Sequence, residues 1–106
     1  MKLGVFGVLY ADKPLEEMLD IVVSQGLDAV EIGAGGLIPK THCNPEEMLK
    51  DKDKIKHFKN EVEKRNLTIS ALSCHGNIVH PDESFSEQHI NDFKNTVRLC
   101  SELEID

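Results

Sequence analysis

The sequence has few cysteines, few basic residues and no long hydrophobic run, and each shortage excludes a class of protein. Its three cysteines are Cys43, Cys74 and Cys100, an odd number without a CxxC pair. A disulfide framework and a zinc clip are therefore not expected, and free thiols point to a reducing compartment. No stretch approaches the roughly 20 apolar residues of a membrane span. The apolar start is too short for a signal peptide, so we expect a cytoplasmic location.

Basic residues are the minority among the charges, with 12 Lys and Arg against 19 Asp and Glu, a formal net charge of −7. A surface of this charge repels polyphosphate, so we expect neither nucleic acid nor a membrane as partner. A small anionic ligand remains compatible, because a pocket sets its own local field. The 106 residues suffice for one modest core, so residues 1–106 are predicted to form one domain.

Runs of apolar and β-forming residues alternate with segments in which apolar residues recur at helical spacing. The predicted strands cover residues 3–9, 27–33 and 67–73. The predicted helices cover residues 13–25, residues 45–65, and a last segment that begins at Ser84 or Ser86. Asn44 is predicted to cap the second helix. In the last helix, the predicted buried stripe is Ile90, Phe93, Val97 and Cys100.

The predicted fold class is α/β, with a parallel sheet in the order β-α-β-α-β-α. The long loops 33–45 and 74–84 both follow strands, which places the chemistry at one edge of the sheet. The first strand lacks the glycine fingerprint of an open nucleotide-binding sheet. The GAGG of residues 33–36 follows the second strand, where it is a weak signal for a phosphate cradle and a better one for a turn with positive φ. A partial TIM (β/α)₈ barrel is therefore favoured.

A complete barrel needs roughly 250 residues, so three strand–helix units supply only part of one. An isolated set of this kind leaves sheet edges open. The chain is therefore either the first three units of a longer protein or a homo-oligomer that completes its sheet by self-association.

Three stretches carry a family resemblance: GLDAVEIGAGG (26–36), HCNP (42–45) and ISALSCHGNIVHP (69–81). They resemble the N-terminal part of the sugar phosphate isomerase/epimerase family, whose xylose isomerase-like barrel is also related to endonuclease IV. The resemblance implies an enzyme of carbohydrate metabolism that moves a proton next to the carbonyl of a sugar or sugar phosphate. It also implies a divalent metal, Mn²⁺, Mg²⁺, Co²⁺ or Zn²⁺, held mainly by ligands from the second half of the barrel.

Two other functions remain open. A truncated barrel can act as a non-catalytic module that binds a ligand or associates with itself. A metal-dependent hydrolase of the endonuclease IV kind uses the same scaffold, although the net charge of −7 opposes binding to DNA.

Glu31 and His75 are the strongest candidate site residues. Glu31 is a carboxylate inside a strand that otherwise looks buried, so it must face something polar. It is predicted to be catalytic, as a general acid or base, or else a structural carboxylate paired across the sheet. His75 follows the third strand, at the active-site rim of a barrel. There it is expected to bind substrate, with loop backbone as the alternative partner.

Weaker candidates surround this pair. Three further residues are predicted to contact substrate: Tyr10, Asn77 and His42. The structural alternative is packing for Tyr10, a tight turn for Asn77 and a cap on local backbone for His42. His75 and His80 are weak metal-ligand candidates, because a loop spacing fixes no geometry. Cys74 is expected to be a buried thiol, since neighbouring strand residues such as Cys74 and His75 point to opposite faces.

Overall fold

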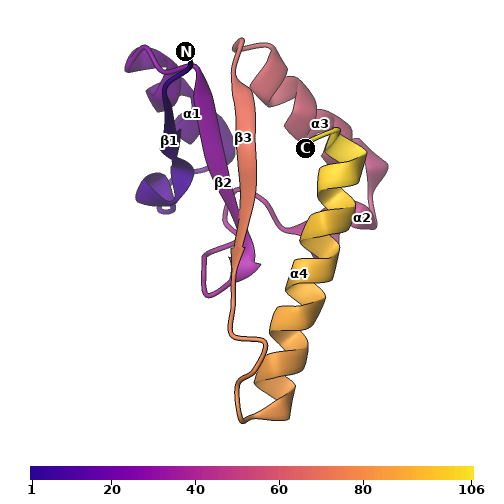
Figure 1. The fold of residues 1–106 in the computed structure, drawn as a ribbon. Coiled ribbons are helices and arrows are strands. Elements are labelled where there is room, and N and C mark those ends of the chain that lie inside the picture. The colour runs from indigo at the N-terminus through magenta and orange to yellow at the C-terminus, as the bar shows by residue number, and fades with distance from the viewer.

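The computed structural model describes residues 1–106 and has three parallel strands and four α-helices (Figure 1). The strands are β1 (Gly4–Phe6), β2 (Ala29–Gly36) and β3 (Thr68–His75). The helices are α1 (Leu15–Ser24), α2 (Pro45–Leu49), α3 (Lys52–Glu63) and α4 (Glu83–Leu103), with a 3₁₀ helix, η1 (Gly7–Tyr10). The sheet order is β1-β2-β3, and both pairings are parallel. The predicted α/β class is confirmed.

The strand lengths differ from the prediction. The run 3–9 gives only three strand residues, because Gly7 packs against Met18 of α1 and the chain coils into η1 there. In contrast, β2 continues through the GAGG segment to Gly36, which pairs with His75. Ladder hydrogen bonds between β2 and β3 outweigh the low β-propensity of glycine. The predicted loop 33–45 therefore begins only after Gly36.

The predicted helix over residues 45–65 is two helices. Asn44 caps α2 as predicted, because its side chain accepts a hydrogen bond from the Glu47 N–H. Asp51 then accepts the N–H of Asp53 at 3.0 Å and caps α3. A short polar side chain that bonds its own backbone competes with continuation of a helix, so the pattern breaks at Asp51.

The last helix begins earlier than predicted and turns a different face inward. Its cap is Asp82, which accepts the N–H groups of Ser84 and Phe85, and not Ser84 or Ser86. The predicted stripe is wrong, since Phe93 and Val97 are 56% and 52% exposed. The buried residues of α4 are His89, Asp92, Thr96, Leu99 and Leu103. Asp92 turns inward because its partners lie at and just after the end of β2. His89 accepts a hydrogen bond from the loop after β3, and Thr96 donates to a carbonyl oxygen of its own helix.

The core lies on one face of the sheet. Alternate residues of β2, Val30, Ile32 and Ala34, are fully buried among side chains from the helices. The opposite face has no helix over it, and β1 and β3 are both edge strands. No helix of the chain is both long enough and apolar enough to cross a membrane.

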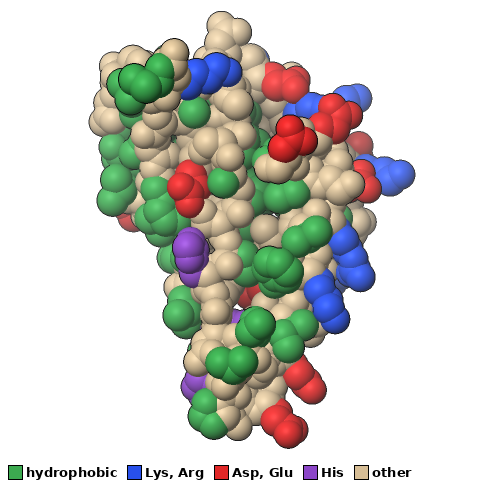
Figure 2. Space-filling view, in the orientation of Figure 1, with side chains coloured by type: hydrophobic (Ala, Val, Ile, Leu, Met, Phe, Trp, Pro, Cys, Tyr) green, Lys and Arg blue, Asp and Glu red, His purple; other side chains and the backbone are tan.

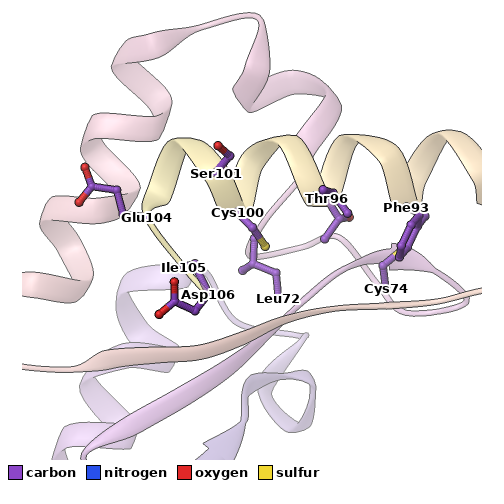
Figure 3. Close-up of a pocket in the computed structure, with 10 residues that line it drawn as sticks. Leu72, Cys74, Phe93, Thr96, Cys100, Ser101, Glu104, Ile105 and Asp106 are labelled. Carbon is purple, nitrogen blue, oxygen red and sulfur yellow. The ribbon is translucent and has the colours of Figure 1, made fainter.

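An apolar groove runs between α4 and the edge of β3. Leu72 and Cys74 of β3 face Phe93, Thr96 and Cys100 of α4 across it (Figure 3). Hydrophobic side chains also gather on the exposed surface of α4 in the space-filling view (Figure 2). The stripe that the sequence predicted to be buried is thus the outer wall of this groove.

Candidate functional site

Glu31 stands on the face of the sheet away from the helices. Its neighbours Val30 and Ile32 are buried in the core, so the alternation of a strand turns Glu31 to the other face. There the hydroxyl of Ser73 on β3 donates a hydrogen bond to Oε1 of Glu31. Ser73 is buried and Glu31 half-buried. The carboxylate is thus held by a neutral hydroxyl and not by a cation.

His75 lies on the same face, two residues beyond Ser73, or roughly 7 Å further along β3. It is exposed and is the last residue of β3, which continues two residues beyond the predicted strand end at Ser73. The two residues do not emerge at one level, however, because β2 extends five residues past Glu31 to Gly36. On the other side, β1 ends at Phe6, directly opposite Glu31. The rim therefore descends from His75 on β3 to Glu31 beside the end of β1.

A groove of about 390 Å³ opens over the helix-free face beside Glu31. All three strands contribute to it, and its lining is Lys2, Gly4, Val5, Phe6, Ala29, Glu31, Thr68 and Ser70. This surface mixes the apolar side chains of Val5, Phe6 and Ala29 with polar groups from all three strands.

A buried carboxylate, Asp92 of α4, organises the end of β2. Its Oδ2 accepts the N–H of Gly36 at 2.9 Å, and its Oδ1 accepts Nζ of Lys40 at 2.6 Å and Nε2 of Gln88 at 3.0 Å. We call these four residues the Asp92 network. Burial raises the pKa of Asp92, but the hydrogen bonds from Lys40 and Gly36 outweigh it, so the pKa lies below its usual value. Asp92 is therefore a fully satisfied anion.

The glycines of β2 make room for this network. Gly35 and Gly36 both have positive φ, 145° and 70°, as the sequence predicted for the GAGG segment. A Cβ on Gly35 would come within 3.0 Å of the Asp92 carboxylate, and one on Gly36 within 2.1 Å of the His75 carbonyl oxygen. The segment thus allows α4 to approach the backbone of β2 closely.

Residues 76–82 form a loop held to the first turns of α4. The N–H of Asn77 donates to Nδ1 of buried His89 at 2.7 Å. Asn77 also accepts the N–H of Val79 through its side chain, which is a turn contact. His80 accepts the N–H of Asp82 at 3.0 Å. This loop and the first half of α4 extend beyond the end of β3 (Figure 1).

His42 and Tyr10 lie away from the Glu31 face. Nε2 of His42 donates to the carbonyl oxygen of Lys13 at 2.8 Å, and the ring is 8% exposed. The Tyr10 hydroxyl accepts Nε2 of Gln25 at 3.1 Å. Gln25 follows the last turn of α1, which leads back to the amino ends of the strands. The two side chains join neighbouring segments, and their predicted contacts with substrate stay predictions.

All three cysteines are free thiols. Burial raises the pKa of Cys43 to about 12. Burial also raises the pKa of Cys74, whose side chain lines the groove on the α4 side (Figure 3). His75 is the next residue of the strand, and neighbouring strand residues point to opposite faces. A thiol with a raised pKa is a poor nucleophile at neutral pH, so Cys74 and His75 do not form a catalytic pair.

Ligands for a metal do not converge at the rim. The chain has one group of three side chains close enough to share an ion, Glu16, His57 and Glu61, and it lies between α1 and α3 in the helix layer. Both carboxylate oxygens of Glu61 already bind cations, Lys64 at 2.7 Å and Arg65 at 2.6 Å. His75 and His80 belong to no such group. The residues of this chain therefore do not by themselves fit the divalent metal that the resemblance implies.

The reasoning from sequence missed Asp92, His89, Lys40 and Ser73. Asp92 and His89 carry a recoverable signal, because with Thr96, Leu99 and Leu103 they follow helical spacing. An apolar stripe one residue away concealed it. Ser73 is unremarkable in the sequence, and its contact with Glu31 depends on the pairing of β2 with β3.

Two comparisons relate the chain to known proteins. Residues 19–106 match the family model described as xylose isomerase-like TIM barrel. The chain is also 34% identical over 105 residues to the uncharacterized protein YfiH of Bacillus subtilis (strain 168). The alignment covers 99% of the chain and 33% of YfiH, so the chain spans about a third of that relative. No solved structure matches the chain.

Proposed function

Because the chain belongs to the xylose isomerase-like TIM barrel family, we propose that it forms the first three strand–helix units of a sugar isomerase or epimerase. The observation that supports this most is Glu31, a half-buried carboxylate on the helix-free face whose partner is the neutral hydroxyl of Ser73. In a closed barrel that face lines the interior below the active-site rim. The free thiols agree with a cytoplasmic location.

Glu31 acts in this proposal as the general base. One carboxylate oxygen is held by Ser73, which leaves the other to take the proton from the carbon next to the substrate carbonyl. The C–H electron pair becomes the double bond of an enediolate, and the carbonyl oxygen takes the negative charge. Protonation of the former carbonyl carbon, with transfer of the hydroxyl proton from one oxygen to the other, gives the isomer. Protonation of the original carbon from the opposite face gives the epimer. A proton transfer of this kind contributes roughly 10²- to 10⁴-fold to the rate.

His75 orients the substrate in the same proposal. Its exposed ring stands at the end of β3, within reach of a sugar hydroxyl or of the carbonyl oxygen on which charge develops. A divalent metal supplies Lewis-acid chemistry in many enzymes of this family. Metal dependence here requires ligands in addition to those of residues 1–106.

Exchange of solvent deuterium tests the proposal directly. The intact gene product is incubated in D₂O with a panel of aldoses, ketoses and their phosphates, with and without added divalent metal. We expect deuterium to enter the position next to the carbonyl of at least one sugar, detected by NMR or mass spectrometry. Absence of exchange on the whole panel contradicts the proposal.

A second candidate is a non-catalytic module that associates with itself. Both sheet edges are free, and Phe93 and Val97 expose an apolar face beside the edge of β3. Edges and faces of this kind favour pairing with another copy. Sedimentation of the 106-residue chain distinguishes the candidates: a stable dimer that Val97→Glu disrupts favours the module, whereas a monomer opposes it.

A further inference from the structure

The end of β2 has the elements of an anion-binding site. Backbone N–H groups in glycine-rich segments with positive φ form concavities that hold phosphate, and a nearby lysine adds positive charge. Here Gly35 and Gly36 supply the backbone, and Lys40 supplies the ammonium group. Both the Gly36 N–H and Nζ of Lys40 point at the carboxylate of Asp92, at 2.9 Å and 2.6 Å. An internal carboxylate occupies the place of an anion.

Other sites that attract anions at this end of the sheet are also neutralised. The N-terminus of α4 is capped by Asp82, which accepts the N–H groups of Ser84 and Phe85. The first turn of α1 carries Glu16 and Glu17, and Glu17 also pairs with Lys13 at 3.3 Å. Negative side chains at helix N-termini compete with an incoming phosphate for the same field.

We infer that Asp92 is a specificity-determining residue that excludes phosphate from the part of the rim formed by β2 and β3. It does so by permanently filling the site made by Gly36 and Lys40. The part of a substrate that faces these strands then carries no phosphate group. This inference rests on the proposed function for the identity of the ligand as a sugar, but the exclusion of phosphate is a property of the Asp92 network alone.

The geometry places the exclusion next to the candidate site. Gly36 pairs with His75 in the sheet, and the N–H of Leu37 donates to the His75 carbonyl oxygen at 2.6 Å. Asp92 itself is 5% exposed, behind this backbone. The donors that a phosphate at this place would need, the Gly36 N–H and the Lys40 ammonium, are therefore already paired with an anion.

Phosphate binding to the intact gene product tests the inference without reference to catalysis. Inorganic phosphate is titrated while the amide signal of Gly36 is followed by ¹⁵N NMR. We expect no specific shift in the wild type. In Asp92→Ala, the freed Gly36 N–H and Lys40 should bind phosphate at least roughly tenfold more tightly, the effect expected of new charge-assisted hydrogen bonds. The double variant Asp92→Ala/Lys40→Met should lose this gain.

The outcomes separate the two proposals. A phosphate-dependent shift at Gly36 in the wild type overturns the inference, and so does a folded Asp92→Ala that gains no phosphate binding. Asp92→Ser, which also vacates the site but keeps a small polar side chain, replaces the alanine variant if that one does not fold. If the NMR results are as expected but no sugar exchanges deuterium, the proposed function fails and the exclusion of phosphate stands.

Discussion

Asp92 of α4 and Glu31 of β2 are two carboxylates that contact the sheet in different environments. Asp92 is 5% exposed and accepts hydrogen bonds from Gly36, Lys40 and Gln88. Glu31 is half-buried and has the hydroxyl of Ser73 as its partner. The Asp92 carboxylate is buried and both of its oxygens are paired, whereas one oxygen of Glu31 is left for a ligand. The difference teaches that a buried charge marks structure when it is fully paired, and a candidate site when it is not.

The largest effect that separates the two carboxylates should come from Glu31→Gln. Removal of the general base is expected to lower kcat by roughly 10²- to 10⁴-fold, with little change in the free energy of unfolding, because a neutral amide can still accept from Ser73. Deuterium exchange and chemical denaturation measure the two quantities. Glu87→Gln, at an exposed position of α4, is the matched control. Retention of wild-type kcat in Glu31→Gln contradicts the catalytic role.

Asp92→Ala should act on stability instead. It leaves Lys40 and the Gly36 N–H without their partner, and breaking a buried ion pair costs about 3–5 kcal/mol in the free energy of unfolding. Urea denaturation monitored by circular dichroism gives this value. Asp53→Ala, at an exposed position in the first turn of α3, should cost much less. Equal losses in the free energy of unfolding would show that the Asp92 network stabilises the fold no more than an exposed carboxylate does.

Ser73→Ala tests the surroundings of Glu31, where one hydrogen bond holds the carboxylate. Loss of one hydrogen bond is expected to lower stability by about 0.5–1.5 kcal/mol and to reduce kcat, because the Glu31 carboxylate loses the contact that orients it. Ser24→Ala, which removes an exposed hydroxyl of α1 that donates to the Ile21 carbonyl oxygen away from the groove, is the control. A change in KM with unchanged kcat would indicate that Ser73 contacts substrate rather than positioning Glu31.

Lowering the pH should gradually reduce the free energy of unfolding, because the paired carboxylates of Asp92 and Glu61 become protonated. The pKa of Asp92 is lowered on folding, and hydrogen bonds from Lys64 and Arg65 lower the pKa of Glu61 to about 2. Stability from such groups is fully present above their unfolded pKa values of about 4 and is lost as pH falls through the lower folded values. Denaturation between neutral and acid pH measures the slope. Asp92→Asn and Glu61→Gln should each flatten it, and an unchanged slope in both contradicts the assignment.

The sequence predicted the fold class but not the lengths of the elements. Patterns of apolar residues carry the order of strands and helices, and the parallel sheet was confirmed on that basis. The end of β1 at Phe6 and the extension of β2 to Gly36 depend on pairing with residues far along the chain. Local propensity contains no information about such partners.

The candidate site was predicted in part, for the same reason. His75 was predicted to lie just after the third strand, and the structure makes it the last residue of β3; local patterns locate a strand end to within a few residues. The inward face of α4 was misjudged, because Phe93 and Val97 look like core residues when only hydrophobicity is considered. Asp92 takes the inward position instead, because it binds Gly36 and Lys40. The sequence pattern could not reveal this, because these partners are more than 50 residues away.

By itself the sequence determined the alternation of strands and helices, the cap at Asn44 and the positive φ of the glycine segment, since each depends on residues a few positions apart. Only the tertiary structure decided that Ser73 meets Glu31 and that Asp92 meets Gly36 and Lys40. Those contacts join separate elements, and their free energy is gained only when the sheet and α4 have packed together.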